Sequence, residues 1–197
     1  MNTKKRLFLA IPLPEEMIAA FSGYEKQFSD LPHARWVPPE NFHITVYFIG
    51  WVEESNLSEI TERLAKAFML MGSFYLQFDK IIWAPPSSTT KVGTTEGQSP
   101  PPRMIWALFE RSPDFENLVE KVDKAARSFL SRETMKESIP HVTLVRFDAS
   151  SKWKKIKIKQ PDLRQKNIKI NQINLMESRL LRTGPIYSEV ANFYLTK

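Results

Sequence analysis

Two short segments, 98 residues apart, share one pattern, and this repeat constrains the fold more than any other feature of the chain. The segments are Phe42-His43-Ile44-Thr45 and Pro140-His141-Val142-Thr143. Both have the hydrophobic, β-branched composition of strands. A strand unit that occurs twice predicts an internal duplication with pseudo-two-fold symmetry.

Residues two apart in a strand project from the same face. His43 and Thr45 are therefore expected on one face of their strand, and His141 and Thr143 on one face of theirs. The hydrophobic residues that alternate with them would face a core. If the two copies face each other across a cleft, two imidazoles and two hydroxyls surround one pocket.

This set of side chains suits phosphodiester chemistry. Histidine titrates near neutral pH, so one imidazole can take a proton from water while the other protonates a leaving oxygen. Threonine hydroxyls can bind phosphate oxygens. A serine triad fits less well because the sequence has no G-x-S-x-G elbow, and H-x-T lacks a second metal ligand at the usual spacing. The alternative is a pair of core histidines bonded to their threonines. His33 has no such threonine and is expected on the surface.

The 197 residues include no cysteine, which excludes a disulfide framework, thiolate metal sites and a cysteine nucleophile. The length predicts a single domain over 1–197. No stretch approaches the ~20 apolar residues of a membrane helix. The basic residues before Leu7 resemble the start of a signal peptide, but Pro12 and Pro14 interrupt the apolar run and favour a buried strand. We expect a cytoplasmic protein without a cofactor.

The net charge of +6 is concentrated in the segment 152–169, which holds eight basic residues and one acidic residue. A basic segment on a nearly neutral body indicates a polyanionic partner. The lysines of 155–159 also alternate with isoleucines, as in an edge strand that resists pairing with another chain. The charge pattern alone leaves both interpretations open.

Periodicity and turn signals predict an α+β fold with antiparallel pairing. Helices are expected over 14–30, 53–70 and 112–130. A long loop is expected over 85–102, which contains five prolines. Strands are expected over 5–13, 36–37, 41–48, 73–84, 103–109, 139–147, 168–177 and 185–195.

The sequence resembles the 2H phosphoesterases, named for two H-x-T motifs, and within them the RNA 2′,3′-cyclic phosphodiesterases once called 2′-5′ RNA ligases. The resemblance is carried by Arg35 to Gly50 and by Pro140 to Arg146, with weaker agreement at 103–106 and 175–187. It implies two pseudo-symmetric lobes, each an antiparallel sheet with outer helices, and an active-site cleft between them. The 85–102 loop and the dense lysines of 152–169 depart from the family pattern.

The resemblance also implies an activity: hydrolysis of a 2′,3′-cyclic phosphate at an RNA 3′ end to a 2′-phosphate, without a metal. His43 would be the general acid and His141 the general base, while Thr45 and Thr143 would bind phosphate oxygens. Two further residues have expected roles, Arg146 at the phosphate and Phe48 stacked on the terminal base. Strict alternation places both side chains on the face of the strand that does not carry the histidines, so each role requires a bulge or twist.

Other functions use the same residues. The chain could act on small cyclic nucleotides or an ADP-ribose cyclic phosphate, or bind RNA ends without turnover. Ligation through a 2′-5′ bond is the reverse of the hydrolysis and uses the same groups. We expect a monomer that binds RNA and does not associate with a membrane.

Overall fold

The computed structural model describes residues 3–27, 33–85, 102–130, 138–147, 157–163, 166–181 and 184–196. The expected 85–102 loop lies outside these residues, except for its two end prolines. The helices are α1 (Glu15–Ser22), α2 (Leu57–Phe68) and α3 (Pro113–Ala126). The strands are β1 (Lys4–Pro12), β2 (Arg35–Trp36), β3 (His43–Glu53), β4 (Phe74–Ala84), β5 (Met104–Phe109), β6 (His141–Arg146), β7 (Asn167–Ile170), β8 (Gln172–Leu181) and β9 (Gly184–Tyr194).

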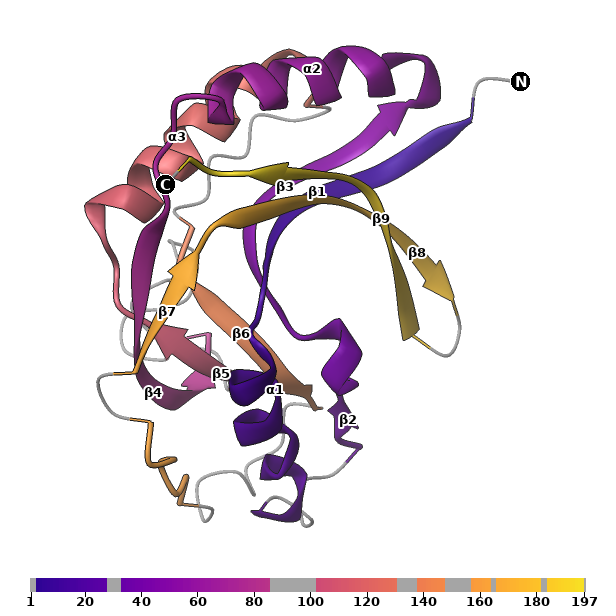
Figure 1. Cartoon of the computed structure of the whole chain (residues 1–197). Helices are drawn as coiled ribbons and strands as arrows, with labels where there is room; N and C mark the ends of the chain where they lie inside the picture. Colours follow the sequence, from indigo (N-terminus) through magenta and orange to yellow (C-terminus); the bar gives the residue numbers. More distant parts are fainter. Residues whose placement is uncertain are drawn as a thin grey trace, which may run out of the picture.

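The strands form one curled sheet in the order β7-β4-β5-β6-β3-β1-β8-β9, with β2 paired to β6, and all these pairings are antiparallel (Figure 1). The order is symmetric about the central strands β3 and β6. One half of the sheet contains β1 and β3, which come before and after α1 in the chain. The other half contains β5 and β6, which come before and after α3. The sheet therefore contains two related halves, which confirms the α+β fold with antiparallel pairing.

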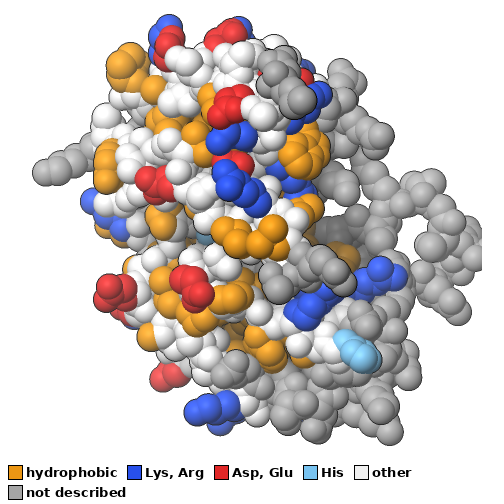
Figure 2. Space-filling view, turned by 90° about the vertical axis from the view of Figure 1, so that its right-hand side faces the viewer, with side chains coloured by type: hydrophobic (Ala, Val, Ile, Leu, Met, Phe, Trp, Pro, Cys, Tyr) orange, Lys and Arg blue, Asp and Glu red, His pale blue; other side chains and the backbone are white. Residues whose placement is uncertain are grey.

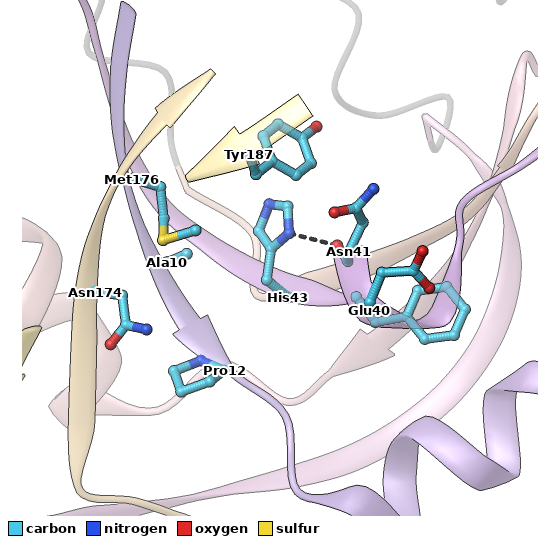
Figure 3. Close-up of a pocket in the computed structure, with 9 residues that line it drawn as sticks. Ala10, Pro12, Glu40, Asn41, His43, Asn174, Met176 and Tyr187 are labelled. Carbon is cyan, nitrogen blue, oxygen red and sulfur yellow. Dashed lines mark hydrogen bonds between the residues drawn. The ribbon is translucent and has the colours of Figure 1, made fainter. Parts of the chain in front are cut away.

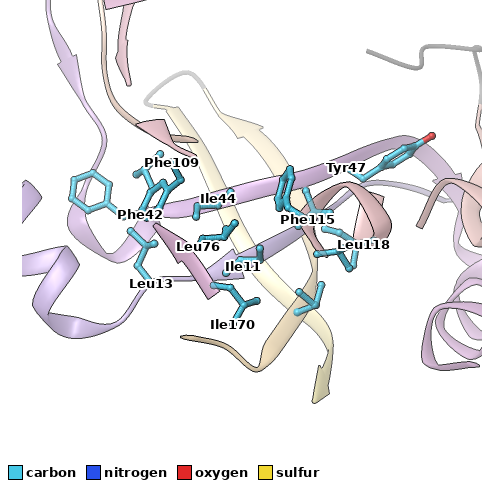
Figure 4. Close-up of a cluster of buried hydrophobic side chains, with 14 of the residues drawn as sticks. Ile11, Leu13, Phe42, Ile44, Tyr47, Leu76, Phe109, Phe115, Leu118 and Ile170 are labelled. Carbon is cyan, nitrogen blue, oxygen red and sulfur yellow. The ribbon is translucent and has the colours of Figure 1, made fainter. Parts of the chain in front are cut away.

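The helices cover one face of the sheet and enclose a single hydrophobic core (Figure 4). Phe21 of α1 packs against Phe78 of β4, with ring centroids 5.9 Å apart. Phe115 and Leu118 of α3 belong to the same buried cluster as Ile44 of β3. Helix α2 packs against β9 through Phe68 and Phe193, 5.3 Å apart. The opposite, concave face carries the histidines.

Local sequence explains why α3 begins where it does. The Ser112 side chain accepts a hydrogen bond from the backbone N–H of Phe115, and Pro113 occupies the first turn. Asp114 and Glu116 lie in the same turn, where acidic side chains complement the positive end of the helix dipole. Buried residues then recur at helical spacing and hold the helix on the sheet.

Three expectations about secondary structure were wrong. The helix expected over 14–30 ends at Ser22, whose hydroxyl bonds to the Ile18 carbonyl, and Gly23 follows it. The strand expected over 168–177 is two strands that break at Asn171, because β7 pairs with β4 whereas β8 pairs with β1 and β9. Residues 157–159, the described part of the possible edge strand 155–159, lie outside any strand.

A buried carboxylate joins α3 to β3. Asp123 is only 2% exposed and accepts a hydrogen bond from the Tyr47 hydroxyl at 2.7 Å and one from Arg127 Nε at 3.0 Å. Burial alone raises the pKa of Asp123, but the hydrogen bonds from Tyr47 and Arg127 outweigh it and lower the pKa below its ordinary value. The folded state therefore favours the ionised carboxyl.

We expect Asp123→Asn to lower the free energy of unfolding by about 1–3 kcal/mol at neutral pH. Because the folded-state pKa is depressed, this stabilisation is complete above the unfolded-state pKa near 3.9 and is lost as the pH falls through the folded-state pKa. Urea unfolding at pH 7 and at about pH 3.5 should show the difference between variant and parent shrinking in acid. Asp162→Asn, at an exposed site, is the matched control; a difference that is independent of pH would contradict this account.

Candidate active site

The two H-x-T units start the two central strands, which are neighbours in the sheet. Ile44 of β3 pairs with Val142 of β6 in antiparallel register. Continuing this register sets His43 opposite Thr143 and Thr45 opposite His141. Ile44 and Val142 are fully buried, whereas the histidines and threonines are half-buried on the other face. The burial pattern therefore agrees with the prediction that the hydrophobic residues face the core and that the histidines and threonines lie on the other face.

An equivalent β-bulge follows each H-x-T unit. Leu9 and Ala10 of β1 face Tyr47 and Thr45, so Val46 is an extra residue in β3. Ile105 and Trp106 of β5 face Val145 and Thr143, so Leu144 is the corresponding extra residue in β6. In both strands two consecutive residues are buried at this point. After each bulge, a residue that strict alternation would place on the core face lies on the opposite face instead.

The bulges return Phe48 and Arg146 to the face that carries the histidines. These residues are five positions after His43 and His141, respectively, and both are exposed. Phe48 contacts Phe8, which also packs against His43. The Arg146 charge adds to burial in lowering the pKa of both histidines, and Nη1 of its guanidinium lies 3.0 Å from Met104 Sδ. The two residues are thus equivalents in the duplicated unit.

Both imidazoles are held in the same way. Nδ1 of His43 lies 2.7 Å from the Asn41 carbonyl oxygen, and Nδ1 of His141 lies 2.7 Å from that of Ile139. A carbonyl oxygen only accepts hydrogen bonds, so Nδ1 is the protonated nitrogen in each ring. Each Nε2 is then available for proton transfer, and Nε2 of His43 accepts from the Thr45 hydroxyl at 3.1 Å.

His43 borders a pocket of about 170 Å³ between η2 (Pro39–Asn41), β1, β8 and β9 (Figure 3). The Tyr187 ring lies edge-on to His43, with centroids 5.3 Å apart, and Phe8 packs against the imidazole at 5.1 Å. The lining of the pocket combines polar and apolar side chains. Its lining residues are Ala10, Pro12, Glu40, Asn41, Phe42, His43, Asn174, Met176 and Tyr187.

His141 has a different neighbour. Its imidazole stacks on the Trp106 ring, with centroids 3.7 Å apart and an interplanar angle of 20°. Trp106 belongs to β5 and pairs with Thr143. The flat stack restricts rotation of the imidazole, so the Trp106 ring and the Ile139 carbonyl together orient Nε2 of His141.

Burial gives both histidines pKa values below 6.5. Desolvation is the main reason that the pKa of His141 is lowered to about 4; the bond to Ile139 opposes the change, and the charges of His43 and Arg146 add to it. The pKa of His43 is also lowered by burial, against the bond to Asn41 and with the charge of Arg146. Both imidazoles are thus mainly neutral at pH 7 in the free protein.

Among the residues that the structure describes, no group of three or more His, Asp or Glu side chains is placed to hold a metal ion. No helix in the described ranges is long and apolar enough to span a membrane.

Figure 2 views the molecule from the open side of the sheet in Figure 1. It shows hydrophobic side chains gathered near the middle of this face, with Lys or Arg side chains beside them. His33 is exposed and lies outside the pocket, as expected.

A family model described as "LigT like Phosphoesterase" matches residues 11–106, which include the first H-x-T unit. A Thermotoga maritima protein named RNA 2′,3′-cyclic phosphodiesterase is 29% identical over 187 residues, 92% of this chain and 91% of the relative. A Methanocaldococcus jannaschii protein of the same name is 29% identical over 188 residues, 94% of this chain and 98% of the relative. This chain is therefore similar to the LigT-like phosphoesterases and, over most of its length, to proteins named RNA 2′,3′-cyclic phosphodiesterase.

Solved structures share this LigT-like fold. The crystal structure of the Thermus thermophilus protein TT0787 has a TM-score of 0.76 and 25% identity, and the match covers 96% of this chain and 97% of that one. Escherichia coli LigT in complex with 3′-AMP has a TM-score of 0.76 and 18% identity, covering 99% and 100%. The curled antiparallel sheet is therefore the fold of the LigT-like proteins.

The structure adds site residues that the sequence analysis did not single out. Phe8 shares a face with Ala10 and Pro12, two and four residues further along β1, but the whole strand reads as one hydrophobic run. Tyr187 and Trp106 reach the histidines from strands far away in the sequence. A doubled hydrophobic pair after each threonine, Val46-Tyr47 and Leu144-Val145, is the available sequence signal for the bulges.

Proposed function

We propose that this chain hydrolyses a 2′,3′-cyclic phosphate at the 3′ end of RNA to a 2′-phosphate, by histidine acid–base catalysis and without a metal. The observation that carries the proposal is the pair of identically held imidazoles on adjacent strands. The names of the Thermotoga and Methanocaldococcus relatives support the substrate. The proposal includes a monomeric protein that acts in the cytoplasm.

The reaction requires one proton acceptor and one proton donor. Nε2 of His141 takes a proton from water, and the water oxygen forms a bond to phosphorus. The bond between phosphorus and O3′ breaks, and Nε2 of His43, which is protonated when the negative phosphate is bound, gives its proton to O3′. The product keeps its phosphate on O2′. Burial lowers the pKa of His141 to about 4, so this imidazole is neutral at pH 7 and able to accept the proton.

The neighbouring residues have proposed roles at the phosphate and the base. Thr45 and Thr143 would donate hydrogen bonds to the non-bridging phosphate oxygens. The Arg146 guanidinium would offset the negative charge that develops during attack. Phe48, exposed beside Phe8, would stack on the terminal base.

The test is to incubate the purified protein, in EDTA, with a short RNA that ends in a 2′,3′-cyclic phosphate. The proposal expects a 2′-monophosphate as the product. A 3′-monophosphate would reverse the assigned direction of ring opening, and loss of turnover in EDTA would refute metal independence. Turnover of cyclic mononucleotides or ADP-ribose cyclic phosphate with no turnover of RNA would favour the small-molecule alternative. Tight binding without turnover would favour an RNA-end-binding module.

The pH dependence should reveal the pair of histidines. We expect kcat/KM to follow a bell with its maximum between about 4 and 6.5, because this parameter reports the lowered pKa values of the free protein. The bound phosphate is negative and raises the pKa of both imidazoles, so the bell for kcat should lie at higher pH. Rate profiles across the acidic and neutral range measure both. Identical maxima for the two parameters would contradict the expectation.

A further inference from the structure

A second exposed aromatic residue lies beyond Phe48 on the same face of β3. Trp51 is 54% exposed and Phe48 is 64% exposed, although large aromatic side chains are usually buried. Both residues belong to the half of the sheet that contains the pocket at His43. Their position next to the proposed site calls for an explanation other than packing.

The strand register shows that the two rings share a face. Phe48 is opposite Phe8 and Trp51 is opposite Arg6, and residues two apart on β1 project to the same side. A bulge makes this possible, because Ile49 is an extra residue between these pairs and Gly50 adopts a positive φ of 87°. A side chain at position 50 would be strained in that conformation. Along β1 the step from Phe8 to Arg6 is about 7 Å.

A positive charge accompanies the two rings. Arg6 makes no ion pair with any residue in the described part of the chain, whereas its neighbour Lys4 is paired with Glu53 at 2.9 Å. The Arg6 charge also acts on the Tyr187 hydroxyl, which belongs to the ring that lies against His43. Arg6 is thus the register partner of Trp51, and it lies two residues before Phe8, which packs against His43.

We propose that Phe48, Trp51 and Arg6 form a binding platform for the single-stranded nucleotides that precede the RNA 3′ end. The terminal base stacks on Phe48, the preceding base stacks on Trp51, and Arg6 contacts the phosphate that joins the two nucleotides. Stacking on aromatic rings with a nearby arginine is how proteins hold unpaired RNA without reading its sequence. This inference rests on the proposed function, which supplies the RNA end at His43.

The platform predicts a substrate-dependent loss of activity. Trp51→Ala should lower kcat/KM about 5- to 100-fold for an oligonucleotide with a cyclic phosphate end, the range expected for one lost base–aromatic stack. The same variant should change kcat/KM for a nucleoside 2′,3′-cyclic phosphate less than about two-fold, since this substrate has no preceding base. Tyr75→Ala is the matched control, because Tyr75 is 59% exposed but lies on β4 in the other half of the sheet.

Arg6→Gln tests the phosphate contact separately. It should weaken the salt dependence of kcat/KM for the oligonucleotide, because one fewer counterion is released when RNA binds.

An equal loss of activity on both substrates in Trp51→Ala, or an equal effect of Tyr75→Ala, would overturn the platform. A shift from dimer to monomer in Trp51→Ala would also overturn it and would assign the surface to self-association.

A direct measurement of RNA binding tests the platform independently of catalysis. The probe is a fluorescently labelled single-stranded RNA with a plain 3′-hydroxyl, measured by anisotropy. Weaker binding by Trp51→Ala, with wild-type binding by Tyr75→Ala, supports the platform even if the cyclic phosphate is never hydrolysed. Hydrolysis by the wild-type protein with unchanged RNA binding in Trp51→Ala would refute the platform and leave the proposed function intact.

Discussion

Replacing His43 or His141 by alanine is expected to lower kcat for cyclic-phosphate hydrolysis by at least about 10²-fold. In the proposed reaction each imidazole transfers one proton, and a positioned general acid or base contributes about 10²–10⁴-fold. Because the two groups act in the same transition state, the double variant should be little worse than the single variants. Assays with the cyclic-ended RNA under substrate saturation measure this loss.

Both variants should remain folded, because the two histidines are half-buried at the edge of the core and their strands are held by Ile44 and Val142. Circular dichroism and urea unfolding check this condition. His33→Ala replaces an exposed histidine and is the matched control, expected to keep full activity. Wild-type turnover by either His43→Ala or His141→Ala would refute the two-histidine mechanism.

The second large effect is on stability. Phe21 of α1 is 1% exposed. Its ring centroid lies 6.4 Å from that of Phe42 and 5.9 Å from that of Phe78. Phe21→Ala removes both contacts and leaves a cavity, so we expect the free energy of unfolding to fall by about 3–5 kcal/mol. Urea unfolding at neutral pH measures the change.

Two companion variants make this expectation specific. Phe21→Leu retains most of the buried volume and should recover more than half of the loss. Phe129→Ala, at a half-buried residue that follows α3, should cost clearly less than Phe21→Ala. Equal losses for Phe21→Ala and Phe129→Ala would show that α1 is not a principal support of the core. Phe42 directly precedes His43, so this packing also supports the start of β3.

The placement of the four histidine and threonine side chains of the candidate site was predictable because it follows from local sequence. His43, Thr45, His141 and Thr143 occur in two strand-like segments, and the period of a strand places each pair on one face. The antiparallel α+β fold also followed from the order of the elements. No distant contact is needed for either inference.

The remaining features depend on contacts between distant segments. The positions of Phe48 and Arg146 are set by bulges opposite β1 and β5, and strand pairing is invisible in a single segment. The same holds for 168–177, which looks like one strand but divides at Asn171 between the two halves of the sheet. Of the basic segment 152–169, Lys166 forms an ion pair with Glu16 at 2.7 Å, and its other proposed partner, RNA, stays a prediction.

The exchange of helices between the two halves has a consequence for how the chain folds. Helix α1 arises between β1 and β3 but reaches β4 through the contact of Phe21 with Phe78, and α3 arises between β5 and β6 but is tied to β3 through Asp123 and Tyr47. Each half therefore covers part of its partner's apolar surface, as the subunits of a domain-swapped dimer do. We therefore expect the two halves to unfold together, so that the register between the two histidines is lost in the same transition as the rest of the sheet.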